Sequence, residues 1–171
     1  NLNLETASEF LLMATWLAYL KSKLLLPEDA EDDFKALEFF RTKNLNIVNE
    51  DILGSIEFSC KVAGSKLLLV LGHARCGAVM GACDKVELGN LTPMLAKIGP
   101  AIQSTTEPSD PEKRNSKDAE FVDAVARNNV LQSIAMIREK SAILAELEAE
   151  GEIIIQAAYY QVATGEVEFI D

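Results

Sequence analysis

The chain has 171 residues, of which 49% are hydrophobic and 25% are charged, a balance typical of one folded domain with a hydrophobic core. Its 27 acidic and 16 basic residues give a formal net charge of −11, which repels phosphate backbones and argues against direct nucleic-acid binding. Three cysteines, an odd number at irregular spacing, do not make a disulfide framework, so we expect a reduced, cytoplasmic protein.

The first expected element is a long helix over residues 7–26. Thr6 and Glu9 have the spacing of a capping box at its start, and a proline ends it. Its uncharged run, residues 10–20, is shorter than the roughly 18 residues of a membrane span, and a signal peptide's basic start is missing. We therefore expect no membrane segment, but a helix buried against protein and followed by an acidic linker, residues 27–33.

Residues 34–48 are ambiguous between helix and strand, and the pattern becomes clear only after them. Asn49 is a good N-cap, apolar residues then repeat at helical spacing, and Gly64 predicts the end of this helix. The uninterrupted apolar run KLLLVLG, residues 66–72, predicts a strand covered on both faces. A short helix is expected over residues 77–83.

The second half of the chain continues this alternation. Thr92 and Pro93 predict the cap and the first residue of another helix, and a polar loop follows over residues 104–117. A long helical stretch is expected over residues 118–150, with a break near Ser141.

Two strands are expected near the C-terminus. Residues 152–162 predict a second buried strand, and the turn ATG leads from it into a short strand over residues 166–170. Strands and helices in this order predict an α/β fold with a mostly parallel sheet.

His73 and Cys76 are the candidate metal ligands. They directly follow the apolar strand at residues 66–72, and open α/β sheets place their ligand sites at this end of their strands. Imidazole nitrogen and thiolate sulfur both bind zinc well, but zinc needs at least three protein ligands. The two residues therefore make only part of a site, an incidental pair is the alternative, and no catalytic residue is assigned.

From about residue 46 to its end, the chain resembles a β-class carbonic anhydrase of the bacterial and plant type. The resemblance implies a mostly parallel sheet flanked by helices, dimers or larger assemblies, and one zinc held by Cys, His and Cys. It also implies reversible hydration of carbon dioxide to bicarbonate, with His73 and Cys76 as the family's His and second Cys. The matching stretches are NIVNEDILGSIEFSCKVAGSKLLLVLGHARCGAV, GACDKVELGNL, FVDAVARNNV, REKSAILAELEAEG and AAYYQVATGEVEF.

The family's first motif, Cys-x-Asp-x-Arg, is absent from this chain. In the family it supplies the remaining thiolate and an Asp–Arg pair that orients the fourth zinc position. The only cysteine before His73 is Cys60, which we expect to be a small buried core residue. The resemblance therefore implies a sheet truncated at its first strand and a zinc site whose activity is impaired.

The stretches ASEFLLMA and YLKSKLLLP, within residues 2–33, resemble part of the bacterial segregation and condensation protein A, a kleisin. We therefore divide the chain into a kleisin-like helical segment with an acidic linker, residues 1–33, and a carbonic-anhydrase-like domain, residues 34–171. Three functions follow: a zinc carbonic anhydrase of impaired activity, an inactive carbonic-anhydrase-like binding or oligomerisation module, and a chromosome-segregation interaction protein.

Overall fold

The computed structural model describes residues 48–170. The expected helix over residues 7–26, the linker and the ambiguous stretch before residue 48 lie outside the described residues and stay predictions. Within the described part, no helix combines the length and apolar character needed to cross a membrane.

Three strands form one sheet in the order β1-β2-β3: β1 (Leu67–His73), β2 (Ile154–Tyr160) and β3 (Val167–Ile170). β1 and β2 are parallel, whereas β2 and β3 are antiparallel. The expectation of a mostly parallel sheet is therefore wrong for residues 48–170, where the sheet is mixed. The turn between β2 and β3, with Gly165 at φ +77°, is too short for the crossover that parallel strands require.

The first described helix, α2 (Glu50–Glu57), begins where the sequence predicts. The Asn49 side-chain oxygen accepts a hydrogen bond from the Ile52 amide at 3.0 Å, which satisfies one free donor of the first turn. A π-helical turn, η1 (Phe58–Val62), continues α2, and Gly64 follows in the left-handed conformation at φ +81°. The predicted cap and end of this helix are both confirmed.

Three short helices follow β1: α3 (Gly77–Cys83), α4 (Leu91–Ala96) and α5 (Gly99–Ser104). The bounds of α3 match the prediction. The prediction that Thr92 caps the next helix is wrong, because α4 begins one residue earlier and the Thr92 hydroxyl instead accepts from the Leu88 amide at 2.8 Å. The polar loop predicted after α5 contains a single 3₁₀ turn, η2 (Pro111–Lys113).

The long helical stretch is broken at Ser141, as predicted, into α6 (Ala119–Lys140) and α7 (Ala142–Ala149). Ser141 has extended backbone angles, and its hydroxyl accepts from the Leu144 amide at 3.2 Å, which starts α7. The same hydroxyl donates to Glu57 at 2.6 Å and so ties this break to α2.

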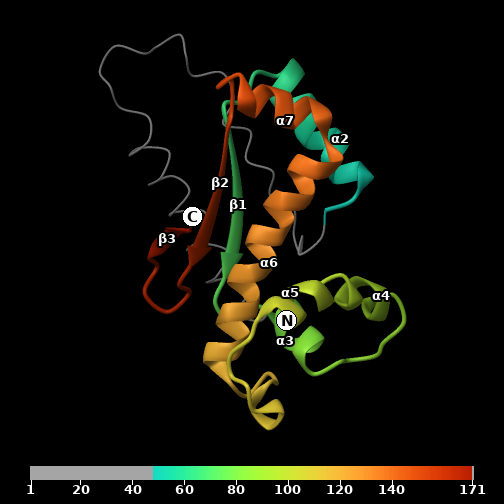
Figure 1. The fold of residues 1–171 in the computed structure, drawn as a ribbon, viewed down its shortest axis with the longest axis vertical. Helices are drawn as coiled ribbons and strands as arrows, with labels where there is room; N and C mark the ends of the chain where they lie inside the picture. Colours follow the sequence, from blue (N-terminus) through green and yellow to red (C-terminus); the bar gives the residue numbers. More distant parts are fainter. Residues whose placement is uncertain (1–47, 171) are drawn as a thin grey trace, which may run out of the picture.

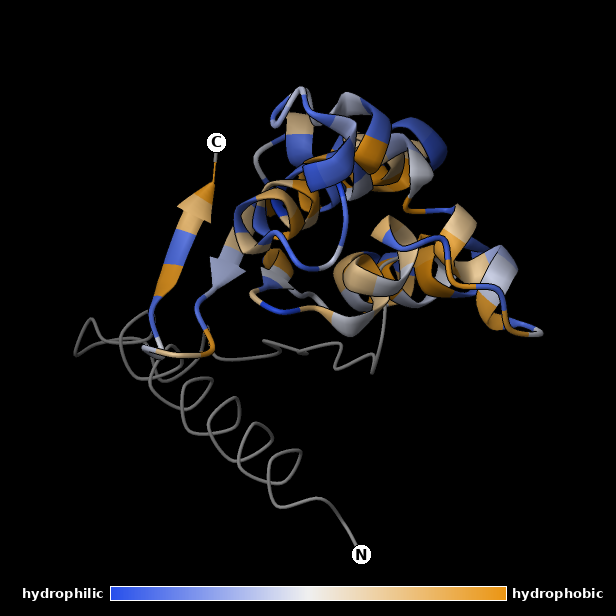
Figure 2. Cartoon of the chain, turned by 90° about the horizontal axis from the view of Figure 1, so that it is seen from below, coloured by the Kyte–Doolittle hydropathy of each residue, from blue (hydrophilic) through white to orange (hydrophobic). Residues whose placement is uncertain are grey.

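The helices pack on one face of the sheet, and α6 makes the central contact with β1 and β2 (Figure 1). Figure 2 shows the same separation from below, with the strands on one side and the described helices on the other. Alternate residues of each strand point into the core, because successive side chains of a strand point to opposite faces of the sheet. Those that face the helices are Leu68, Val70, Ile155, Ala157, Tyr159 and Ile170.

The opposite face of the sheet is strongly apolar, and we call it the open sheet face. On it, Ile154 and Phe169 have 62% and 53% of their surface exposed. Every residue of β1 is half-buried, on the helix-facing side as well as on the other, so the expectation that this strand is covered on both faces stays a prediction within the described part of the chain. The free edge of β1 pairs with no strand in that part. The open sheet face carries Leu67, Leu69, Leu71, Ile154 and Phe169, together with Gln156 and the buried Ala158 and Tyr160.

Gly72 is where α6 approaches β1 most tightly. A Cβ atom placed on Gly72 would lie 2.6 Å from Val130 Cγ2 and 3.4 Å from Tyr159 Cδ2. The absence of a side chain at this position lets the helix and the neighbouring strand close around the end of β1.

We expect Gly72→Ala to lower the free energy of unfolding by about 1–3 kcal/mol, because the added methyl overpacks this contact. Gly54→Ala is the matched control: a Cβ atom at Gly54 meets nothing within 4 Å, and the change should stabilise α2 by about 0.5–1 kcal/mol. Urea unfolding of both variants measures the difference. Equal stability of the two variants would contradict the close approach at Gly72.

Candidate metal centre

His73 is the last residue of β1, and its ring has a defined hydrogen bond. The ring Nδ1 donates to the backbone carbonyl oxygen of Ala74 at 3.0 Å. A carbonyl oxygen only accepts, so the proton of this hydrogen bond is on Nδ1. The ring is also a hydrogen-bond partner of the Cys76 side chain.

The two residues between His73 and Cys76 form a tight turn. The Ala74 amide donates to the Tyr160 carbonyl at 2.9 Å and extends the β1–β2 ladder by one bond. Arg75 then adopts φ +57°, in the left-handed region that side chains other than glycine rarely occupy. This conformation reverses the chain, so that Cys76 returns toward the His73 ring at the start of α3.

The Cys76 thiol is buried, with 6% of the residue exposed, yet its pKa is lowered. Burial alone raises the pKa of this thiol, but the His73 side chain opposes it, both as a hydrogen-bond partner and through its charge. The backbone amides of Val79 and Ala78 act in the same direction as His73. The surroundings of Cys76 therefore favour the thiolate, the form that binds metals.

The other two cysteines have the opposite electrostatics. Burial raises the pKa of Cys60, which packs in the core formed by α2, α6 and α7. Burial and the neighbouring Asp84 carboxylate raise the pKa of Cys83 to about 11. Both cysteines are 7% exposed core residues, as the sequence predicts for Cys60.

The structure brings together the predicted pair, His73 and Cys76, and their role as metal ligands stays a prediction. Within residues 48–170, no cluster of three or more His, Cys, Asp or Glu side chains is placed to hold a metal ion. The described residues therefore supply two donors. Zinc sites in proteins have three or four protein ligands, so two donors make an incomplete site.

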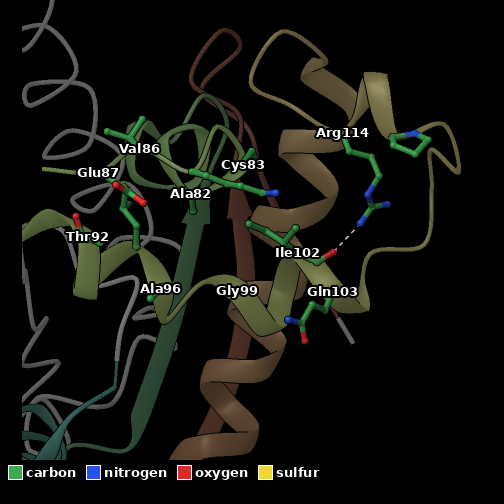
Figure 3. A pocket seen from close by; sticks show the side chains of 13 residues that line it. Ala82, Cys83, Val86, Glu87, Thr92, Ala96, Gly99, Ile102, Gln103 and Arg114 are labelled. Carbon is green, nitrogen blue, oxygen red and sulfur yellow. Dashed lines mark hydrogen bonds between the residues drawn. The ribbon is translucent and has the colours of Figure 1, made fainter.

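A cavity of about 540 Å³ lies between α3, α4, α5 and the loop around η2 (Figure 3). Neither His73 nor Cys76 lines it. Lys85 and Arg114 are the cations of its lining, and Arg114 is already used within the fold, since it donates to the carbonyls of Ile102 at 2.8 Å and Pro108 at 3.2 Å. The same guanidinium lies 4.7 Å from the centre of the Phe121 ring. The cavity is therefore separate from the candidate metal centre.

One polar contact near the site was not anticipated from sequence. The buried Tyr159 hydroxyl donates to the Asp123 carboxylate at 2.7 Å, joining β2 to α6. Tyr159 and its neighbour Tyr160 are both buried, at 0% and 3% exposure. No local motif marks the contact, because the two partners are 36 residues apart.

Comparison with known proteins gives one consistent result. The family model for carbonic anhydrase matches residues 32–167. Carbonic anhydrase 2 of Mycobacterium tuberculosis is 27% identical over 124 residues, which are 70% of this chain and 56% of the relative. The chain thus spans little more than half the length of this curated relative.

Solved structures agree on the fold. A Coccomyxa β-carbonic anhydrase in complex with acetazolamide aligns with a TM-score of 0.60 at 17% identity, over 75% of this chain and 59% of that one. A tetrameric β-carbonic anhydrase from Sordaria macrospora aligns with a TM-score of 0.57 at 16% identity, over 72% and 61% of the two chains.

The three thiols should differ sharply in reactivity although they are almost equally buried. We expect iodoacetamide at neutral pH to alkylate Cys76 fastest and Cys83 slowest in chelator-treated protein, because the thiolate is the nucleophile. As pH rises, alkylation of Cys76 should level off first, since its pKa is lowered, whereas that of Cys83 should still increase toward pH 11. Mass spectrometry of the peptides over time measures this order, and equal rates for Cys76 and Cys60 would refute it.

Proposed function

This chain belongs to the β-class carbonic anhydrase family, and on that basis we propose that it is a zinc protein in which the hydration of carbon dioxide to bicarbonate is impaired. The observation that carries the proposal is the contact between His73 and Cys76, which lowers the pKa of the thiol at the C-terminal end of β1. The pair thus includes a sulfur whose thiolate form, the form that binds zinc, is favoured.

The two donors fit zinc chemically. Imidazole nitrogen and thiolate sulfur are both good zinc ligands, and the negative charge of the Cys76 sulfur is favoured. When bound, zinc supplies a water of near-neutral pKa, which yields hydroxide for attack on carbon dioxide. His73 and Cys76 would hold the ion and set its position relative to the end of the sheet.

Impairment follows from the number of donors. The sequence lacks the Cys-x-Asp-x-Arg motif, and residues 48–170 supply no third ligand beside the pair. A zinc ion held by two protein ligands binds more weakly than one held by three. Without this motif there is no Asp–Arg pair to orient the fourth zinc position, at which substrate reacts.

The same observation favours one alternative, a catalytically inactive module that retains the fold and the pair without useful hydration activity. A chromosome-segregation role depends on the kleisin-like resemblance of residues 2–33, which lie outside the described residues. The family relationship over residues 32–167 favours the carbonic anhydrase proposal over that role. Three thiols without a disulfide fit a reducing compartment, and we propose the cytoplasm.

We expect the purified chain to bind zinc and Cys76→Ser to lose it. Changes in groups that merely support zinc ligands cost about 10–100-fold in affinity, so removal of a donor should cost more. Cys83→Ser is the matched control, since Cys83 is equally buried but is not a partner of His73, and it should keep the zinc. Metal analysis and competition with a chromogenic chelator measure both variants.

Stopped-flow hydration of carbon dioxide separates the impaired enzyme from the inactive module. The impaired enzyme predicts a rate above background that Cys76→Ser abolishes. A zinc-loaded chain at the background rate would favour the inactive module, and a chain that binds no zinc would overturn the proposal. Turnover equal to that of a full-length relative would refute the impairment.

We also propose that the protein is a homodimer or a larger assembly. The open sheet face supports this, because it carries exposed apolar side chains, Ile154 and Phe169 among them. The related enzyme from Sordaria macrospora is described as tetrameric. A second copy covering this face would remove those side chains from water.

Ile154→Lys should weaken self-association, because it places a charge on the open sheet face, at the start of β2. Val62→Lys is the matched control, since Val62 is similarly exposed at 69% but lies on η1, away from the sheet. Light scattering after size exclusion, over a range of concentrations, measures the mass of each. A monomeric wild-type chain, or equal masses for the two variants, would contradict the proposed interface.

A further inference from the structure

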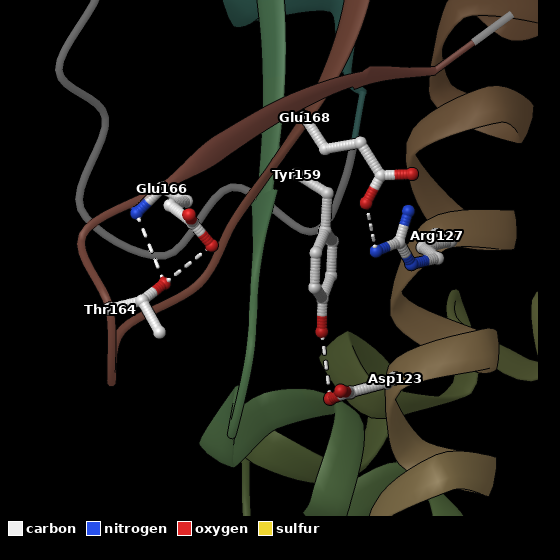
Figure 4. Close-up of polar contacts among 6 residues, drawn as sticks. All are labelled: Asp123, Arg127, Tyr159, Thr164, Glu166 and Glu168. Atoms are coloured by element: carbon white, nitrogen blue, oxygen red, sulfur yellow. Dashed lines mark hydrogen bonds and ion pairs between the residues drawn. The ribbon is translucent and has the colours of Figure 1, made fainter.

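Tyr159 is held on two sides by groups from α6. Its hydroxyl donates to Asp123 at 2.7 Å, and the Arg127 guanidinium lies over its ring, 4.2 Å from the centroid (Figure 4). Arg127 is in turn paired with Glu168 of β3 at 2.6 Å. Burial and the Asp123 carboxylate both raise the pKa of Tyr159, so the neutral phenol that donates this hydrogen bond is the stable form.

The Tyr159 ring lies next to the candidate metal centre. Tyr159 pairs with Gly72 in the sheet, and a Cβ atom on Gly72 would be 3.4 Å from the ring. Tyr159 and Cys76 also belong to one packed core, which includes Val79 and Val125. The ring therefore supports the backbone immediately before His73 and shares its packing with Cys76.

We propose that Tyr159, held by Asp123, is a positioning residue for the His73–Cys76 pair. This inference rests on the proposed function, in which the pair binds zinc. The hydrogen bond to Asp123 fixes how the Tyr159 ring lies against Gly72 and the core around Cys76. This packing would set the angle at which His73 and Cys76 approach a bound metal ion. Because only two donors are known, the geometry of the short loop between His73 and Cys76 determines much of the affinity for the metal ion.

Cobalt(II) tests this, because its visible absorption bands report ligand geometry and its thiolate charge-transfer band reports the bond to sulfur. We expect Tyr159→Phe, which keeps the ring and removes the hydroxyl, to weaken cobalt binding about 10-fold and to shift the visible bands. Asp123→Ala should do the same, whereas Asp123→Asn, which retains an oxygen acceptor, should restore most of the wild-type spectrum. The double variant should be no weaker than either single one, because both lose the same hydrogen bond.

Arg138→Ala is the control for a general loss of stability. It removes an ion pair with Glu148 of 2.7 Å that joins α6 to α7 and includes no residue of the site. The control should leave the cobalt spectrum and affinity unchanged. Circular dichroism and urea unfolding verify that each variant is folded, and if Tyr159→Phe is not folded, the comparison of Asp123→Ala with Asp123→Asn decides.

The outcomes separate the two proposals. Wild-type protein that binds neither zinc nor cobalt overturns the proposed function and this inference with it. Wild-type protein that binds cobalt, together with unchanged spectra and affinities in Tyr159→Phe and Asp123→Ala, overturns the positioning role alone. Equal weakening by Arg138→Ala would also overturn it, since the effect would then be one of stability.

Discussion

The close packing of α6 against β1 at Gly72 is the constraint on which the rest of the structure depends. Val130 occupies the space that a side chain on Gly72 would need, and Tyr159 closes the contact from the neighbouring strand. The end of β1, and with it His73, is thereby fixed relative to α6. The same helix carries Asp123 and Arg127, so one element both builds the core and holds the groups next to the candidate metal centre.

The three cysteines differ in the pKa of their thiols because of the groups around them, and not because of how deeply they are buried. All three are 6–7% exposed, and for all three burial opposes ionisation. Only Cys76 has an imidazole within hydrogen-bonding reach, and only there is the cost of burial outweighed. The left-handed turn at Arg75 produces that contact, so a local backbone conformation determines which thiol can act as a ligand.

Sequence predicted the parts of the fold that depend on local hydrogen bonds. The Asn49 cap, the bounds of α3 and the break at Ser141 are each formed by groups within a few residues of one another. Thr92 was assigned wrongly because its hydroxyl accepts from Leu88, upstream, instead of capping the helix that follows. Local preference alone does not decide between these two partners.

Features that depend on contacts between distant parts of the chain could not be predicted from the sequence. An apolar run such as KLLLVLG indicates a strand, but whether one or both of its faces are covered depends on elements elsewhere in the chain. His73 and Cys76 were recognisable as a pair because they are three residues apart and carry a family motif. The contact between Tyr159 and Asp123 connects elements 36 residues apart and has no such signature.

Within the described residues one edge of β1 is unpaired, and this has a consequence for the behaviour of the chain in concentrated solution. Leu67–Leu71 is a charge-free, proline-free run with strong β preference, and such an edge is a template for strand addition and fibrous aggregation. Lys66, exposed directly before it, acts as a gatekeeper, since stacked copies would bring like charges together. Lys66 thus adds a local repulsion at this edge to the general repulsion between copies that the net charge of −11 provides.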